Sequence, residues 1–310
     1  MRIATFNVQN MRLHHSKAGV LLSGARDMDG PTRESAAAKA SDTIDRQLTA
    51  DVLRDANADV VALQEVFDRE TLDYFHDRIL VPSGCAPYPH RVCLPGNDGR
   101  GYDVALMSRI GLEDVRGHAT LTAKDLGLDK EPGGDTDDPV FRRDCLSARV
   151  GGLTLFICHF KAPWPDAESA WTTRRLEALA VRRLIEWMFP NPSAAEWMIL
   201  GDLNEPQHEP RGERASAPLV GDFAVDLVER LPEDRRWSYH MQNSSIYSRP
   251  DALLASPALA RRFPDAKPLY LRKGLGHEAA RFSGERLSGV GYHRPHASDH
   301  AAITIDFVGL

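Results

Sequence analysis

The stretch "ILGDLNEP", Ile199–Pro206, decides how the rest of the chain is interpreted. Its apolar start predicts a buried strand, and the glycine followed by Asp202 and Asn204 marks a polar strand end. A turn alone does not require an acid and an amide two residues apart. Side chains two apart on an extended segment point to the same side, so both can face one phosphate. The stretch therefore predicts a strand that ends at a functional site.

The composition is that of an ordinary globular protein. The 310 residues are 42% hydrophobic and 26% charged, which provides for a substantial core. No apolar run approaches the roughly 20 residues of a membrane span, and the N-terminus shows no leader pattern, so we expect a cytoplasmic protein without a membrane partner. The net charge of −6 argues against a wide basic surface for nucleic acid but is compatible with a narrow basic cleft. Four cysteines without CxxC spacing predict reduced, mostly buried thiols.

Strand-like segments outnumber helix-like segments. The strand patterns fall at 2–8, 58–66, 101–109, 145–150, 153–160, 196–204, 251–256 and 301–307. Helical spacing of apolar residues is seen at 44–52, after the potential cap Asp68, and at 176–188. Several strands are apolar on both faces, which favours packed sheets with helices outside. We predict one α/β (α+β) domain over residues 1–310, with a long loop or insertion near 11–41 that borders the site.

Six strand segments end in, or lie next to, polar side chains. These residues are Asn7, Gln64 with Glu65, His159, Asp202 with Asn204, Asp251, and Asp299 with His300. One polar strand end is routine because strands finish at the surface. Six polar strand ends, with no lysine among them, are not explained by this routine preference for polar residues at the surface. Because the tips of neighbouring strands converge, we predict that these groups form one cluster.

Glu65 follows the apolar run "VVALQ", where a buried carboxylate needs compensation. A divalent cation provides it, since magnesium accepts one or two carboxylates and keeps several waters. Glu65 and Asp299 fit that requirement, and Asn7 adds a neutral oxygen. The alternative is a buried ion pair between Glu65 and an arginine.

His159 and His300 each sit next to a strand, where a lone histidine is often only structural. His300, however, has an acid before it and a second acid available in "RPDALL". A carboxylate on one ring nitrogen leaves the other nitrogen to handle a proton. Because adjacent residues on a strand face opposite ways, Asp251 is the better partner for His300, and Asp299 faces the metal.

The ordered set "TFNVQN", "LQEV", "GYDVALMSR", "CHFKA", "GDLNEP", "RPDALLAS" and "ASDHAAI" resembles the endonuclease/exonuclease/phosphatase superfamily. This superfamily includes abasic-site endonucleases, pancreatic deoxyribonuclease, neutral sphingomyelinases, inositol polyphosphate 5-phosphatases and deadenylases. The resemblance covers nearly the whole chain. It implies a four-layer α/β/β/α sandwich, in which two packed mixed sheets are flanked by helices.

The resemblance also implies roles for the clustered residues. Glu65 would be the main ligand of Mg²⁺, or of Mn²⁺, with help from Asn7 and Asp299. The remaining members would be catalytic. Asp202 and Asn204 would hold or activate the attacking water, His159 would stabilise charge on the phosphoryl oxygens, and His300 paired with Asp251 would be a general base or an electrostatic partner.

Further residues are candidates for contact with the substrate phosphate. Tyr102 lies in a "GY" pair similar to that of abasic-site endonucleases, with a spacing one residue shorter, and Arg142 with Arg143 precede a strand that leads toward His159. An arginine-rich helix, with Arg174, Arg175, Arg182 and Arg183, offers charges to a nucleic-acid backbone. We prefer to interpret it as a solvated face balanced by Glu177 and Glu186. His293, Arg294 and His296 either line the cleft or decorate a loop.

These observations favour a magnesium-dependent phosphodiesterase, and a nuclease acting on nucleic acid is our first hypothesis. The second is a small-molecule phosphatase or phosphodiesterase, which the net negative charge of the chain supports. The "PDALL" stretch and Leu200 before Gly201 depart from the pattern of the inositol 5-phosphatases. The third hypothesis, a catalytically silent binding module, is disfavoured because both histidines and all four acids are present. No protein partner is indicated.

Overall fold

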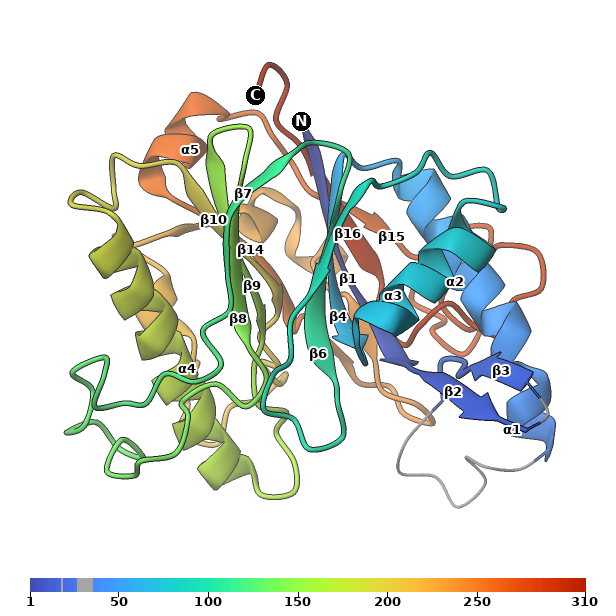
Figure 1. The fold of residues 1–310 in the computed structure, drawn as a ribbon, viewed down its shortest axis with the longest axis horizontal. Helices are drawn as coiled ribbons and strands as arrows, with labels where there is room; N and C mark the ends of the chain where they lie inside the picture. Colours follow the sequence, from blue (N-terminus) through green and yellow to red (C-terminus); the bar gives the residue numbers. More distant parts are fainter. Residues whose placement is uncertain (18, 27–35) are drawn as a thin grey trace.

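Two mixed sheets face each other at the centre of the protein (Figure 1). The computed structural model describes residues 1–17, 19–26 and 36–310. The first sheet has the order β15 (Leu269–Leu271), β16 (Ala302–Asp306), β1 (Arg2–Met11), β4 (Val60–Val66), β6 (Asp103–Ser108) and β5 (His90–Cys93). The second has the order β11 (Val225–Asp226), β14 (Asp251–Ala255), β10 (Trp197–Asp202), β9 (Leu153–His159), β8 (Cys145–Val150) and β7 (Leu112–Arg116).

Smaller elements complete the fold. Two-stranded sheets are formed by β2 (Leu13–Ser16) with β3 (Gly19–Leu22) and by β12 (Tyr239–His240) with β13 (Tyr247–Ser248). The α-helices are α1 (Ala36–Ala40), α2 (Asp42–Ala56), α3 (Arg69–Phe75), α4 (Ala167–Met188) and α5 (Pro257–Arg262). Among the described residues, no helix is long and apolar enough to cross a membrane.

Each central strand is apolar on both faces because both faces are covered. Ile3, Val60 and Leu200 point into the core between the two sheets. Their neighbours on the same strands point outward: Val61 packs under α2 and α3, and Ile199 packs under α4. The helices lie on the outer faces of the sheets (Figure 1). The predicted four-layer α/β/β/α sandwich is confirmed.

The predicted helices are present with shifted boundaries. Asp68 caps α3, since its carboxylate accepts a hydrogen bond from Thr71 N at 2.7 Å. Helix α4 begins at Ala167, nine residues before the predicted start, because Asp166 caps it through Ser169 N at 2.9 Å. Ile44, placed on the apolar stripe from sequence, is 44% exposed.

The segment near 11–41 was predicted as a long loop or insertion. Its described parts contain the paired strands β2 and β3 and the short helix α1. Residue 18 and residues 27–35 lie outside the described residues. The polar, weakly periodic composition of the segment gave no signal for this hairpin.

The interpretation of α4 as a solvated face is wrong for two of its residues. Arg174 is fully buried and pairs with Glu209 at 3.1 Å, while the buried carboxylate of Glu177 accepts hydrogen bonds from the backbone nitrogens of Arg142 and Lys161 at 3.0 and 2.8 Å. Glu186 does form the expected pair, with Arg182 at 2.9 Å.

Candidate active site

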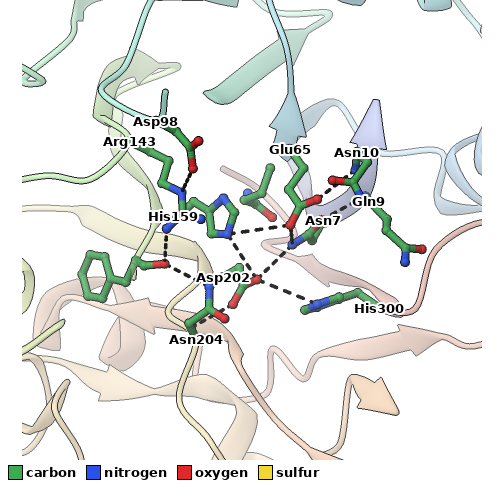
Figure 2. A network of polar contacts seen from close by, with 12 residues as sticks. Asn7, Gln9, Asn10, Glu65, Asp98, Arg143, His159, Asp202, Asn204 and His300 are labelled. Carbon is green, nitrogen blue, oxygen red and sulfur yellow. Dashed lines mark hydrogen bonds and ion pairs between the residues drawn. The ribbon is translucent and has the colours of Figure 1, made fainter. Parts of the chain in front are cut away.

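The polar strand ends meet because their strands run parallel in pairs. β1 pairs with β4, and β9 pairs with β10, so each pair ends at the same edge of its sheet. In the second sheet, Asp202 lies in register between His159 on β9 and Asp251 on β14. These ends open into a cleft of about 600 Å³. Figure 2 shows side chains from both sheets converging there.

Asp202 is at the centre of the converging groups. Its Oδ2 accepts a hydrogen bond from Asn7 Nδ2 at 2.9 Å. The Nε2 atoms of His159 and His300 lie 3.7 and 3.9 Å from the same oxygen. Burial raises the pKa of this carboxyl, and the attraction of His300 opposes that rise. A nearly fully buried acid between two imidazoles is suited to exchanging a proton with a bound water.

The short segment after β10 holds the other oxygen of Asp202. Asn204 N donates to Asp202 Oδ1 at 2.8 Å, and Asn204 Nδ2 donates to the carbonyl of Phe160 at 3.0 Å. Asn204 has a left-handed φ of 53°. Gly201 has a φ of 131°, and a Cβ there would lie 2.1 Å from the carbonyl oxygen of Cys158. The close backbone contact therefore requires glycine at position 201 of "GDLN", while Asp202 and Asn204 serve the chemistry of the site.

Glu65 occupies a bulge in β4. The pairing of β4 with β6 shifts register between Gln64 and Val66, and Glu65 has a left-handed φ of 65°. Such a bulge redirects a side chain, and here it directs the carboxylate into the cleft. Glu65 Oε2 accepts from Asn10 N at 2.8 Å, and Oε1 accepts from Asn7 Nδ2 at 3.2 Å.

The sequence left open a buried ion pair between Glu65 and an arginine. Among the described residues, no arginine or lysine forms an ion pair with Glu65. Its carboxylate and that of Asp202 instead share one amide nitrogen, Asn7 Nδ2. Two carboxylates that face the same space and whose hydrogen bonds come from neutral donors fit a hard divalent cation with oxygen ligands. Asn7 presents its nitrogen to them, because its Oδ1 accepts from Gln9 N at 3.0 Å.

The two histidines have pKa values displaced in opposite directions. Burial lowers the pKa of His159 well below its ordinary value, with a further contribution from Arg143. Burial also acts to lower the pKa of His300, but the combined attraction of Asp251, Asp202 and Asp299 outweighs it and raises that pKa. Asp251 Oδ2 lies 2.8 Å from His300 Nδ1. At neutral pH the site thus contains one neutral imidazole and one protonated one.

Asp202, Asp251 and His300 present ligand atoms that all lie within 4.8 Å of one another, a spacing that a metal ion could also occupy. Asp251 is 2% exposed and lies behind His300, and it does not line the cleft. Asp251 Oδ2 and His300 Nδ1 are already joined by a hydrogen bond of 2.8 Å, which leaves only Nε2 of this histidine for a cation. We therefore interpret Asp251 and His300 as a hydrogen-bonded pair whose Nε2 lies 3.9 Å from Asp202, rather than as metal ligands.

The remaining predicted residues fall into two groups. Tyr102, Arg143 and Asp299 line the cleft, and burial raises the pKa of Tyr102 to about 12. Arg142 does not line it: adjacent residues point in opposite directions, so the side chain of Arg142 is exposed while that of Arg143 is buried.

The loop histidines and Arg294 also lie outside this cleft. His293 pairs with Glu278, and Arg294 pairs with Asp45. His296 is buried and contacts the carbonyl of Ala25 at 3.0 Å. These residues therefore do not line the cleft, and they do more than decorate a loop, because each is held by a polar contact.

Several residues of the site were not identified from sequence. Gln9 and Asn10 line the cleft directly after Asn7, and Asp98 fixes Arg143 through a contact of 3.1 Å with its Nε. Arg143 also donates to the carbonyl of Phe160 at 3.0 Å. The amides inside "TFNVQN" were a usable signal, whereas Asp98 lies in a turn-rich stretch where an aspartate is unremarkable.

The profile of the Endonuclease/Exonuclease/phosphatase family matches residues 4–300. The chain belongs to the endonuclease/exonuclease/phosphatase family. This membership makes it a hydrolytic phosphoesterase. No curated protein sequence matches the chain.

Solved structures of family enzymes share the fold. An AP endonuclease from Archaeoglobus fulgidus is 17% identical, with a TM-score of 0.59 and 99% of each chain covered. Truncated TDP2 from Caenorhabditis elegans is 16% identical, with a TM-score of 0.56, covering 98% of this chain and 96% of that one. A 3′-5′ exonuclease (NExo) from Neisseria meningitidis is 18% identical, with a TM-score of 0.56 and 99% of each chain covered. At these identities the similarity establishes the fold.

Proposed function

We propose that this family member is a magnesium-dependent phosphodiester hydrolase that acts on nucleic acid. The observation that carries the proposal is the convergence of Glu65, His159, Asp202 and His300 in one cleft, from strands far apart in sequence. The nucleases among the structures of the same fold support the choice of substrate class.

Glu65 would hold the ion, together with Asp299 and with Asn7 after rotation of its amide. Mn²⁺ is an alternative to Mg²⁺ because both accept carboxylate and amide oxygens. The chemistry that such an ion supplies is neutralisation of phosphate charge and orientation of the ester for in-line attack. The proton of the attacking water is then taken by a residue of the chain, and the leaving oxygen takes a proton from solvent water.

Asp202 would accept the proton of the attacking water. Asn204 fixes one of its oxygens, so the other faces the cleft. The water oxygen forms a new bond to phosphorus, and the bond from phosphorus to the leaving oxygen breaks with both electrons going to that oxygen. His159, kept neutral by burial, would donate its Nε2 proton as a hydrogen bond to a phosphoryl oxygen. His300, oriented by Asp251, would stabilise the added negative charge.

The chemistry of the cleft lining favours a nucleotide unit as substrate. Arg100 and Arg143 supply positive charge beside Tyr102. Met241 and Ile246, from the turn between β12 and β13, line the same cleft and are 43% and 38% exposed. A nucleic acid offers a phosphate for the cations and an unstacked base for the apolar side chains.

A small phosphate ester is the second candidate. The observation that favours it is the size of the cleft, since about 600 Å³ lies within the roughly 300–1,000 Å³ of small-molecule sites. It would use the same catalytic residues.

The two candidates are separated by incubating the protein and Mg²⁺ with supercoiled plasmid, an abasic duplex, single-stranded RNA and bis-p-nitrophenyl phosphate. We expect cleavage of at least one polymer, and we expect Asp202→Ala and His300→Ala to abolish it. Cleavage of the small diester alone would overturn the nucleic-acid assignment. Polymer cleavage that survives both substitutions would contradict the proposed site.

A further inference from the structure

Strand β1 is interrupted directly after Asn7. Its pairing with β4 shifts register between Asn7 and Met11. Within this interval Gln9 and Asn10 both have left-handed backbones, with φ of 50° and 56°. Two consecutive non-glycine residues in this region are strained and persist only where the surroundings hold them. We call residues 8–10 the β1 bulge.

The β1 bulge contacts all three residues proposed to hold the cation. Gln9 N donates to Asn7 Oδ1 at 3.0 Å, and Asn10 N donates to Glu65 Oε2 at 2.8 Å. The side-chain Oε1 of Gln9 accepts from Asp299 N at 3.1 Å. Asn7, Glu65 and Asp299 come from three different strands or loops, so their relative placement depends on this bulge.

A single guanidinium holds the β1 bulge from behind. Arg46, on α2, is fully buried and donates to the carbonyls of Val8 and Gln9 at 2.5 and 2.6 Å. Its Nε donates to the carbonyl of Ser23 at 2.5 Å. A planar guanidinium fits such a set of carbonyls because its donors form a rigid fork.

The acids nearest in sequence to Arg46 are engaged elsewhere. Asp42 pairs with Arg26, and Asp45 pairs with Arg294. The hydrogen bonds of Arg46 go to neutral carbonyls, and the nearby charges of Asp45, Asp42 and Glu65 only partly offset the cost of its burial, so the pKa of the guanidinium is lowered to about 10. A hydrophobic side chain would fill the space under α2 without that cost, but it would leave the carbonyls of the bulge unpaired.

We propose that Arg46 is a positioning residue for the cation site: by clamping the carbonyls of Val8 and Gln9, it fixes the bulge whose Asn10 amide places Glu65 and whose Gln9 side chain holds Asp299. This inference rests on the proposed function and adds a residue outside the cleft to it. Partners of metal ligands in other proteins change metal affinity by about 10–100-fold when they are replaced.

A purely structural role is the competing explanation, and the chain contains a matched control for it. Arg230 donates to the carbonyls of Ala260, Phe263 and Ala266 at 2.6–3.0 Å, in the same kind of clamp. These residues do not line the catalytic cleft. Replacing Arg230 by lysine thus imposes a similar loss of carbonyl contacts without involving the β1 bulge.

The test is the dissociation constant of Mg²⁺ alone, measured by calorimetry on wild type, Arg46→Lys and Arg230→Lys, with thermal unfolding in EDTA as the measure of stability. We expect both variants to be destabilised, and only Arg46→Lys to bind Mg²⁺ about tenfold more weakly. An unchanged constant in Arg46→Lys, or the same weakening in Arg230→Lys, would overturn the inference.

If Arg46→Lys does not fold, Gln9→Gly decides the question. Glycine accepts the left-handed backbone and retains its N–H, but it removes the acceptor for Asp299 N. Weaker Mg²⁺ binding supports positioning by the bulge, and unchanged binding overturns it. A wild-type protein that binds no Mg²⁺ would instead remove the proposed function and this inference together.

Discussion

His300 lies between two carboxylates, with Nδ1 2.8 Å from Asp251 Oδ2 and Nε2 3.9 Å from Asp202 Oδ2. The first carboxylate is hidden behind the ring, whereas the second lines the cleft. The imidazole thereby connects a buried acid to the one closest to the proposed water site. This separation of an orienting acid from a reacting acid gives Asp251 a role that can be tested apart from Asp202.

Replacing Asp251 by asparagine should lower kcat by about a hundredfold or more, with a smaller change in KM. The substitution preserves the shape of the side chain but removes the charge that orients His300 and raises its pKa. Steady-state kinetics on the substrate identified by the cleavage assay measures both constants. Glu278→Gln is the matched control, because Glu278 also pairs with a histidine, His293, outside the cleft. Equal losses in the two variants would contradict the assigned role.

Glu65→Gln should weaken Mg²⁺ binding by at least about tenfold and reduce activity at low Mg²⁺. Glutamine retains an acceptor for Asn10 N but lacks the charge that a hard cation requires. Titration of Mg²⁺ into EDTA-treated protein checks this, with Glu113→Gln, an exposed acid on β7, as control. Restoration of full activity by the same Mg²⁺ concentration in wild type and Glu65→Gln would refute Glu65 as a ligand.

Ile246 should affect substrate choice more than turnover. It lines the cleft with 38% of its surface exposed, so contact with a base would bury apolar area worth about 1 kcal/mol, or about fivefold in affinity. We expect Ile246→Ser to raise KM for an oligonucleotide by about that factor and to leave kcat unchanged. Val115→Ser, at an equally exposed apolar residue on β7, should change neither constant. An unchanged KM in Ile246→Ser would argue that the bases of the oligonucleotide do not contact this side of the cleft.

The layers of the fold could be predicted because a continuous apolar run is a local property of the sequence. Strands such as Val60–Val66 are covered on both sides, and the sequence records that directly. The polar ends at Asn7 and Glu65, and those at His159 and Asp202, could be predicted to lie together because parallel strands end at one edge of their sheet. For the site, residue type and strand position were therefore sufficient to propose most of the members.

What could not be predicted depends on contacts distant in sequence. The left-handed backbones of Gln9 and Asn10 have no local signature. The burial of Arg46 depends on carbonyls 37 and 38 positions away. Arg143 enters the cleft and Arg142 does not. A shift of one residue would exchange them, and the composition of the segment does not determine that shift.

His118 should make the protein less stable in mild acid. Burial, with a contribution from Arg116, lowers the pKa of this imidazole to about 4, against an ordinary value of 6.5. Between these two values the unfolded chain binds a proton that the folded protein does not, so the free energy of unfolding falls as the pH falls. We expect His118→Gln to remove about 1–2 kcal/mol of the difference in unfolding free energy between pH 8 and pH 4.5. Urea unfolding at both values measures it, and parallel pH profiles of wild type and variant would contradict the assignment.

Glu177 should contribute more to stability than any exposed acid of α4. Its carboxylate is fully buried and accepts from the backbone nitrogens of Arg142 and Lys161, which join the ends of two loops to the helix. Glu177→Ala leaves both donors buried without an acceptor, at a cost of about 2–4 kcal/mol in the free energy of unfolding. Glu186→Ala removes only ion pairs with Arg182 and Arg183 at the surface, at a cost below about 1 kcal/mol. Denaturant unfolding of both variants gives the comparison. Equal costs would mean that the backbone donors find water in place of Glu177.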